Sequence, residues 1–253
     1  MELRYGILST SSIAPRFIAA VRACGKGEIL AVSSRSLSKA QEKAAQLEIP
    51  TAYGSHEELL RDEKVNIVYI SNVNAQHYPW AKKALLAGKH VICEKPCTTS
   101  YAHTKELYEL AKEKGLRVAL NPSPASPDLA EWPLDKGDWL ILNEVEGEDL
   151  TGCAEPQAML DALASRLPHT AIVLTLGKDG AFYRDARQQL HQPAIPVQAV
   201  DTTAAGDTFT GYFLQAVLAG EDPAKALLIA AKAAAIAVTR HGAGASIPVR
   251  DEV

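Results

Sequence analysis

The chain has 253 residues, which is enough for one large α/β domain or two small ones with a well-buried core. Hydrophobic residues make up 47%, charged residues 22%, and the formal net charge is −4; this excludes the basic excess of a typical nucleic-acid-binding protein. The start of the chain does not resemble a signal peptide, and no apolar stretch reaches membrane-spanning length. The composition therefore predicts a globular, cytoplasmic protein without nucleic-acid or membrane partners.

The four cysteines are scattered along the chain, at Cys24, Cys93, Cys97 and Cys153. Cys93 and Cys97 are close in sequence but lack the second pair that a zinc site would need. In a cytoplasmic protein thiols stay reduced. All four are therefore expected to be structural thiols.

The first half alternates short apolar runs with segments of helical periodicity. The runs are β-branched and bounded by polar residues or glycine, which is typical of strands. This β-α-β-α order predicts a parallel sheet covered on both faces. The expected strands are Tyr5–Leu8, Ile29–Val32, Ile67–Ile70 and His90–Cys93, and the expected helices are Ile13–Cys24, Leu37–Leu47, His56–Arg61, Tyr78–Leu86 and Ala102–Lys114.

The same alternation continues in the second half, with expected strands at Val118–Leu120, Trp139–Leu142 and Ile172–Leu176. Two long helices, Ala204–Ala219 and Pro223–Thr239, are expected to close the chain. Gly220 and Pro223 separate them, as helix-stop and helix-start residues do.

No Gly/Ser-rich linker separates the halves, and the segment Leu107–Leu120 is typical of a helix followed directly by a strand. We therefore expect one α/β domain with three α/β/α layers and a continuous, doubly wound, mostly parallel sheet of about eight or more strands. In such a sheet, ligand loops gather at the carboxyl ends of the strands, so the two candidate sites below should share one edge.

The first half carries a loop, Ser9-Thr-Ser-Ser-Ile13, between the first strand and the first helix. Serines stand where a dinucleotide-binding turn usually has its first two glycines, and Ala14 takes the third place. With the block Ala87-Gly-Lys-His-Val-Ile-Cys-Glu-Lys-Pro96, residues 2–116 resemble the glucose–fructose oxidoreductase and inositol dehydrogenase family.

This resemblance implies an NAD(P) site. Ser9, Thr10, Ser11, Ser12 and Ile13 would line the pyrophosphate. Ser34 and Arg35 would face the adenosine ribose, with Arg35 favouring the 2′-phosphate of NADP. Asn74, His77, Glu94 and Lys95 would lie near the nicotinamide. Nothing after Pro96 resembles that family's substrate domain, so dehydrogenase activity is expected to be absent.

From Arg117 onward the sequence resembles the C-terminal half of ribokinase-like carbohydrate kinases. The diagnostic motif is Asp201-Thr-Thr-Ala-Ala-Gly-Asp-Thr-Phe209, and the segments Val118–Ala125, Leu142–Glu148, Leu174–Gly180 and Arg240–Pro248 also match. Independently of the family, Ala204, Ala205 and Gly206 are small enough for backbone amides to gather at a helix N-terminus and hold an anion. Asp207 could then accept a proton from an attacking hydroxyl; the alternative is an N-capped helix whose dipole Asp207 stabilises.

The kinase resemblance implies further site residues and cofactors. The nucleotide's phosphates and ribose would lie along the loop Thr175, Leu176, Gly177, Lys178, Asp179 and Gly180. Mg²⁺ and phosphate would be organised by Asn143 and Glu146. A monovalent cation such as K⁺ would be held by Asp201, Thr203, Ala237, Arg240, Gly242 and Ser246. Ala231 departs from the family, which commonly has Asn or His beside the adenine.

The N-terminal half that grips the sugar in such kinases has no counterpart here. Joining half of a protein from one family to half of a protein from another, at an equivalent helix-to-strand position, is typical of deliberate recombination. The sequence is therefore interpreted as an engineered chimera of a 1–116 Rossmann-type half and a 117–253 ribokinase-like half, packed as one domain. It would have no evolved activity but could bind ATP, phosphate or sulfate. The alternatives are an active carbohydrate kinase and an NAD(P)-binding oxidoreductase.

Overall fold

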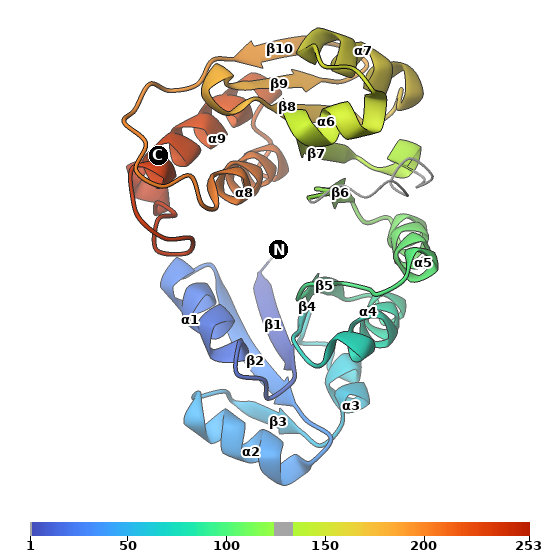
Figure 1. Cartoon of the computed structure of the whole chain (residues 1–253). Helices are drawn as coiled ribbons and strands as arrows, with labels where there is room; N and C mark the ends of the chain where they lie inside the picture. Colours follow the sequence, from blue (N-terminus) through green and yellow to red (C-terminus); the bar gives the residue numbers. More distant parts are fainter. Residues whose placement is uncertain (1, 124–133) are drawn as a thin grey trace. The chain divides into compact units, whose positions relative to one another are not determined.

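The computed structural model describes residues 2–123 and 134–253. The chain divides into two compact units, Met1–Leu116 and Arg117–Val253, here called the N-terminal and C-terminal units (Figure 1). This boundary lies between a helix and a strand, at the residue where the sequence resemblance changes. Among the described residues, no helix has the length and apolar character needed to cross a membrane.

The N-terminal unit is built on a five-stranded sheet in the order β3-β2-β1-β4-β5, with every neighbouring pair parallel. The chain winds outward in one direction from β1 to β3 and then in the other direction through β4 and β5, so a crevice is expected beside the carboxyl end of β1. Its elements are β1 (Leu3–Leu8), α1 (Ala14–Cys24), β2 (Gly27–Ser33), α2 (Leu37–Gln46), β3 (Thr51–Tyr53), α3 (His56–Arg61), β4 (Ile67–Ile70), α4 (His77–Leu86), β5 (His90–Cys93) and α5 (Tyr101–Glu113).

Neighbouring residues of the inner strands point to opposite faces of this sheet and fill separate cores. On one face Ile7 packs with α1 and α2, through Ala14, Ile18 and Ala44. On the other face Leu8 packs with α3, α4 and α5. Both faces are therefore covered by helices, giving the three expected layers.

The C-terminal unit has its own five-stranded sheet in the order β10-β9-β8-β7-β6. The pairs β6/β7 and β7/β8 are parallel, whereas β8/β9 and β9/β10 are antiparallel. Its elements are β6 (Ala119–Leu120), β7 (Trp139–Asn143), α6 (Glu144–Thr151), α7 (Pro156–Arg166), β8 (Ala171–Thr175), β9 (Ala181–Arg184), β10 (Gln189–Gln192), α8 (Ala205–Leu218) and α9 (Pro223–Val238).

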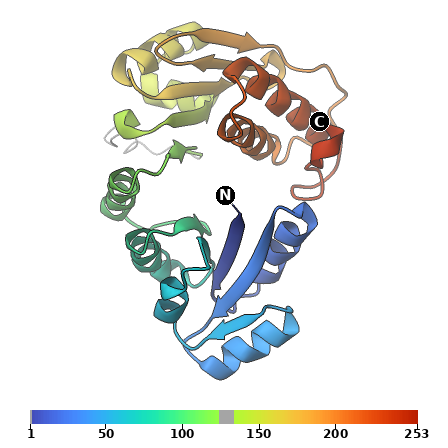
Figure 2. The ribbon, with the colours of Figure 1, turned by 180° about the vertical axis from the view of Figure 1, so that it is seen from behind.

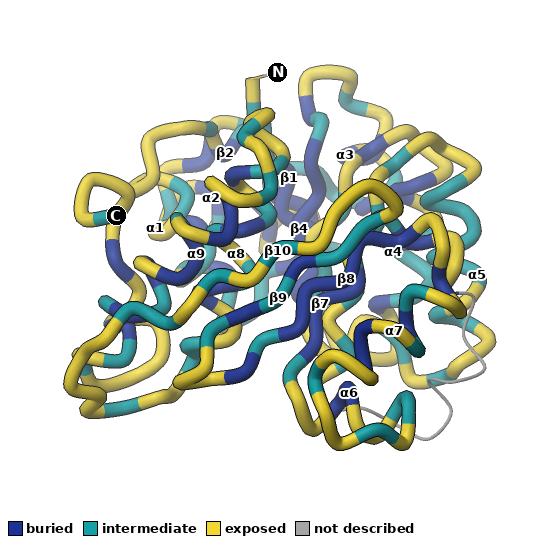
Figure 3. The backbone as a smooth tube through the Cα atoms, turned by 90° about the horizontal axis from the view of Figure 1, so that it is seen from above, coloured by how far each residue is buried: buried dark blue, intermediate teal, exposed yellow. Residues whose placement is uncertain are grey.

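This second sheet is also covered on both faces. Figures 1 and 2 show α8 and α9 side by side, and they pack on Ile141 and Val173 through Phe209 and Phe213. Met159 and Leu160 of α7 cover the opposite face. The central strands β7 and β8 are correspondingly buried along most of their length (Figure 3).

The α/β class, the largely parallel strands and the three layers are confirmed, but the expected continuous sheet is not. The described strands form two sheets, with β5 and β6 at their edges. β6 has only two residues and pairs with β7, while β5 leaves Ile92 39% exposed. An inner parallel strand is normally buried on both faces. Both β5 and β6 therefore have the features of edge strands rather than of inner strands.

Candidate functional site

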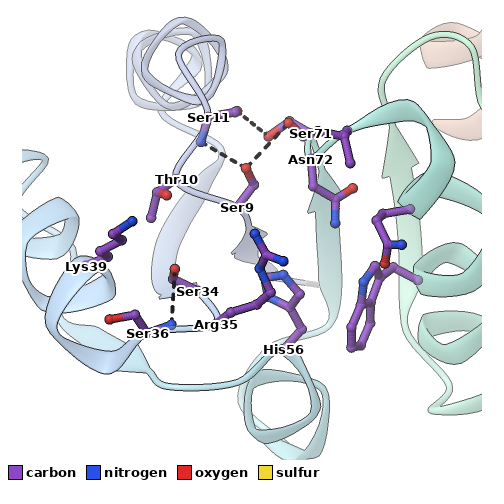
Figure 4. Close-up of a pocket in the computed structure, with 13 residues that line it drawn as sticks. Ser9, Thr10, Ser11, Ser34, Arg35, Ser36, Lys39, His56, Ser71 and Asn72 are labelled. Atoms are coloured by element: carbon purple, nitrogen blue, oxygen red, sulfur yellow. Dashed lines mark hydrogen bonds between the residues drawn. The ribbon is translucent and has the colours of Figure 1, made fainter.

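A cavity of about 850 Å³ lies at the carboxyl edge of the N-terminal unit's sheet (Figure 4). Three strand ends supply most of its wall: Ser9–Ser11 follow β1, Ser34–Ser36 follow β2, and Ser71–Val73 follow β4. This is the crevice predicted from the reversal of strand order. We call it the N-terminal cavity. The other lining residues are Lys39, His56, Gln76 and Trp80.

The serines of the β1–α1 loop bond to one another and to the end of β4. Ser9 is buried, and its Oγ accepts a hydrogen bond from the Ser11 amide at 2.9 Å and donates to the Ser71 carbonyl oxygen at 3.4 Å. The Ser11 and Ser71 hydroxyls are 2.8 Å apart. The Ser11 amide is therefore already engaged, unlike the free amides of a glycine-rich turn. Ser12 and Ile13, predicted beside them, do not line the cavity.

Basic side chains stand on the β2 side of the N-terminal cavity. Arg35 follows β2 and is exposed, and Lys39 lies in the first turn of α2. The Ser34 hydroxyl accepts from the Ser36 amide at 3.4 Å. Two cations beside several hydroxyls make this end of the cavity suited to an anionic ligand.

The four residues predicted near the nicotinamide, Asn74, His77, Glu94 and Lys95, do not line the N-terminal cavity. His77 is buried, and its Nδ1 and Nε2 each lie 2.8 Å from a carbonyl oxygen, of Pro96 and Asn72 respectively. Glu94 accepts a hydrogen bond from the Tyr69 hydroxyl, and burial together with this carboxylate raises the pKa of Tyr69. Neither Glu94 nor Lys95 lines the N-terminal cavity, and Asn74 begins a short 3-10 turn outside it. His77 thus anchors two loops.

A second cavity, of about 230 Å³, lies at the carboxyl edge of the C-terminal unit's sheet. It brings together the predicted residues Asn143, Glu146, Thr175 and Ala204–Asp207. Asn143 ends β7 and Thr175 ends β8, while Ala204–Asp207 begin α8. We call it the C-terminal cavity. Its wall is completed by residues that were not predicted as site residues: Asn121, Ser123, Ile141, Leu142, Thr202 and Thr210.

The start of α8 leaves backbone donors available to this cavity. Ala204 is the N-cap and has a left-handed backbone (φ 63°, ψ 13°), and it provides no side-chain cap. The Ala205 amide donates to Thr202 and the Thr208 amide to Ala204. Within the described chain, the amides of Gly206 and Asp207 have no hydrogen-bond acceptor. They carry the positive end of a 14-residue helix, where an anion is stabilised.

Asn143 and Glu146 form a capping box at the start of α6. The Glu146 amide donates to Asn143 Oδ1 at 2.9 Å, and the Asn143 amide donates to Glu146 Oε2 at 3.0 Å. Glu146 is only 4% exposed. This pair therefore stabilises the helix, and it does so at the wall of the C-terminal cavity.

The loop after β8 folds onto itself. The Leu176 amide donates to Gly180 at 2.8 Å, and the Asp179 amide donates to Leu176 at 3.0 Å. Of the predicted residues 175–180, only Thr175 lines the C-terminal cavity. Ala231 lies in the apolar core of α9, away from the cavity wall.

Among the residues predicted to hold a monovalent cation, Asp201 links two loops by hydrogen bonds. Asp201 accepts hydrogen bonds from the amides of Thr203 and Gly242, each at 2.9 Å. Buried Ser246 donates to Ala243, the Arg240 side chain pairs with Glu252, and Ala237 is buried in α9. Among the described residues, no three His, Cys, Asp or Glu side chains cluster as a metal site would require, and all four cysteines are free.

Asp201 should make folding pH-dependent in acid. Hydrogen bonds from Thr203 and the Gly242 amide lower the pKa of this carboxyl from 3.8 to about 2. A lowered folded-state pKa adds stability above the unfolded-state value, and that stability disappears as the pH falls toward 2. The free-energy difference between the parent and Asp201→Asn should therefore be constant above about pH 5 and shrink below about pH 4. Urea unfolding across this range measures it; a difference independent of pH would contradict the prediction.

The comparisons with known proteins match different parts of the chain to different proteins. A model of the pfkB family of carbohydrate kinases matches residues 55–250. Ribokinase of Schizosaccharomyces pombe is 40% identical over 153 residues, covering 57% of this chain and 48% of that protein. Trans-1,2-dihydrobenzene-1,2-diol dehydrogenase of Mus musculus is 39% identical over 118 residues, covering 46% of this chain and 35% of that protein.

Among solved structures, a ribokinase from Thermotoga maritima shares the fold over the whole chain, with a TM-score of 0.56 and 19% identity, covering 98% of that chain. The chain nevertheless spans only about half the length of the curated ribokinase it matches. These matches support a protein of two parts, one of them ribokinase-like, and do not support an engineered scaffold without activity. Because the family model covers more than half of its residues, the chain belongs to the pfkB family of carbohydrate kinases.

Proposed function

We propose that the C-terminal unit binds the phosphates of ATP–Mg²⁺ and can transfer the γ-phosphoryl group to an alcohol acceptor. The observation that carries this proposal is that the amides of Gly206 and Asp207 have no acceptor among the described residues and belong to residues lining the same cavity as Glu146 and Thr175. Such amides would stabilise negative charge on a transferring phosphoryl group. Asp207 is exposed in the first turn of α8 and would accept the acceptor's proton.

The acidic groups of the C-terminal cavity are compatible with Mg²⁺. This ion usually binds through one or two carboxylates, with water and substrate phosphates completing its shell. Glu146 and Asp207 both line the cavity, and only one Glu146 oxygen is used by the capping box. Bound Mg²⁺ would neutralise charge on the phosphates.

Calorimetric titration of the intact chain with ATP–Mg²⁺ tests this proposal. We expect measurable heat and a ligand-dependent rise in melting temperature, since a ligand that binds the folded state stabilises it. Release of ADP in the presence of a panel of sugars tests transfer. We expect transfer to be slow, because acceptor positioning contributes much of a kinase's rate. Absence of both heat and a melting shift would contradict the proposal.

We propose further that the N-terminal cavity binds NADP. Its support is the combination of Arg35 and Lys39 with the Ser9–Ser11 loop in one cavity large enough for a dinucleotide. The mouse relative is named for a dehydrogenase activity, and the match covers 35% of that longer protein. Binding without hydride transfer is expected.

Replacing Arg35 should remove a preference for NADP over NAD. The side chain would contact the 2′-phosphate, and a charge-assisted hydrogen bond is worth about 2 kcal/mol, or about 30-fold in Kd. Arg35→Ala should therefore weaken NADP binding by about that factor while leaving NAD binding nearly unchanged. Parallel titrations of both cofactors measure the difference. An equal loss for NAD and NADP would show that Arg35 does not recognise the 2′-phosphate.

A further inference from the structure

The N-terminal cavity contains a histidine in addition to its serines and cations. The His56 side chain lines the same cavity, and in the described chain its only hydrogen bond is made through Nδ1. In Figure 4, His56 lies beside Arg35, and Asn72 lies at the β4 side. Polar groups in the interior normally have partners, so the remaining ring nitrogen of His56, Nε2, is a candidate contact for a polar group of a ligand.

The hydrogen bonds behind His56 determine which of its nitrogens carries the proton. The Ser33 Oγ lies 2.7 Å from His56 Nδ1 and also donates to the Ile7 carbonyl oxygen at 3.4 Å. A serine hydroxyl has one proton, so both hydrogen bonds form together only if His56 donates from Nδ1. In the neutral ring Nε2 is then a hydrogen-bond acceptor.

The surroundings favour this neutral ring. His56 is 7% exposed and makes an edge-to-face contact with Trp80 at 4.8 Å between ring centroids. Burial lowers the pKa of His56, and the positive charges of Arg35 and Lys83 lower it further, against the opposing effect of Glu57. A neutral imidazole whose Nδ1–H is engaged offers only an acceptor to a ligand.

We propose that His56 selects a nucleobase that carries an exocyclic amine, such as adenine, over one that carries a carbonyl oxygen at the same position. The proposal rests on the proposed NADP binding in the N-terminal cavity. The adenine amine is a hydrogen-bond donor, which matches the acceptor His56 Nε2. Trp80 and Val73 of the same wall provide apolar surface for a flat ring. A carbonyl oxygen would instead place two acceptors, itself and His56 Nε2, against each other without a donor, and such mismatches are strongly rejected.

Titration calorimetry of the intact chain with NADP and with nicotinamide hypoxanthine dinucleotide phosphate tests this inference. The two ligands differ at one position of the purine, where NADP carries an amine and the hypoxanthine ligand carries a carbonyl oxygen. The parent is expected to bind NADP about 10- to 100-fold more tightly. The double variant Ser33→Ala/His56→Phe removes both partners of the buried hydrogen bond, so neither is left unpaired in the core. Its preference should fall to about threefold or less.

A matched control is His90→Phe, because His90 is exposed on β5 and outside the cavity. This variant should keep the parent's preference, and melting curves verify that each variant is folded. If the parent binds both ligands equally, or prefers the hypoxanthine ligand, base selection by His56 is wrong while NADP binding stands. If neither ligand binds, the NADP proposal fails and this inference fails with it.

Discussion

The Gly180→Ala variant should lose about 3 kcal/mol or more of folding stability in the C-terminal unit. Gly180 has φ +95°, a backbone conformation that residues with a side chain rarely adopt. A Cβ atom there would lie 2.1 Å from the Gln192 carbonyl oxygen and 2.8 Å from the Ala194 nitrogen. Both are backbone atoms and cannot rotate away, so the turn between β8 and β9 would have to deform. Chemical denaturation of the parent and the variant measures the loss.

Gly211→Ala is the matched control for this substitution. Gly211 lies within α8, and apart from its chain neighbours and the helix's own backbone, a Cβ atom there would meet no atom of the described residues within 4 Å. Alanine in a helix interior is more stable than glycine by about 0.5–1 kcal/mol, so this variant should be slightly stabilised. Similar losses in both variants would mean that the contact with Gln192 is not the cause.

The alternation of elements could be predicted because the buried strands leave a clear apolar pattern. β4 is buried at all four positions and β8 at four of five, so both appear as short β-branched runs. β3 was missed because Thr51–Tyr53 has three residues, none of them fully buried. β9 and β10 were also missed. Each alternates buried or half-buried residues with more exposed ones, which is a weaker signal over four residues.

The separation into two sheets could not be predicted from local patterns. The junction has neither a polar linker nor a change of periodicity, since α5 is followed after a short turn by β6. Whether β6 pairs with β5 or with β7 depends on long-range hydrogen bonds that a two-residue strand does not encode. Absence of a linker was therefore a poor guide to sheet continuity.

The candidate sites were predicted only where a motif marks them. Ala204–Asp207 were found because small residues before an acidic helix start form a recognisable pattern. The Asn143 and Glu146 pair has the spacing of a capping box as well as of a kinase motif, and the structure forms the box. Asn121 and Thr202 lie in matching segments but were not named as site residues, and His56 reaches the N-terminal cavity from the start of α3 without any sequence signature.

Gly206→Val should abolish ATP–Mg²⁺ binding by the C-terminal unit, weakening it about 100-fold or more, with little change in melting temperature. Apart from its chain neighbours and the backbone of its own helix, a Cβ atom at Gly206 would meet no atom of the described residues within 4 Å, so the fold itself does not require glycine there. Gly206 does line the C-terminal cavity, and its amide has no acceptor within the described chain. Added side-chain atoms would take space beside the amides that a phosphate would need. Loss of two amide-to-phosphate hydrogen bonds, at about 1.5–3 kcal/mol each, accounts for the expected factor.

Gly211→Val separates loss of the phosphate site from a general effect on α8. Both glycines are exposed on this helix, but Gly211 does not line the cavity, and a Cβ atom there likewise meets no atom of the described residues within 4 Å beyond its chain neighbours and the helix's own backbone. The β-branched side chain should cost either position a similar small amount of helix stability. Calorimetry should therefore show parental ATP binding for Gly211→Val and none for Gly206→Val. If both variants bind as the parent does, the nucleotide phosphates do not lie at the start of α8. If both lose binding, distortion of the helix, rather than blocked amides, is the cause.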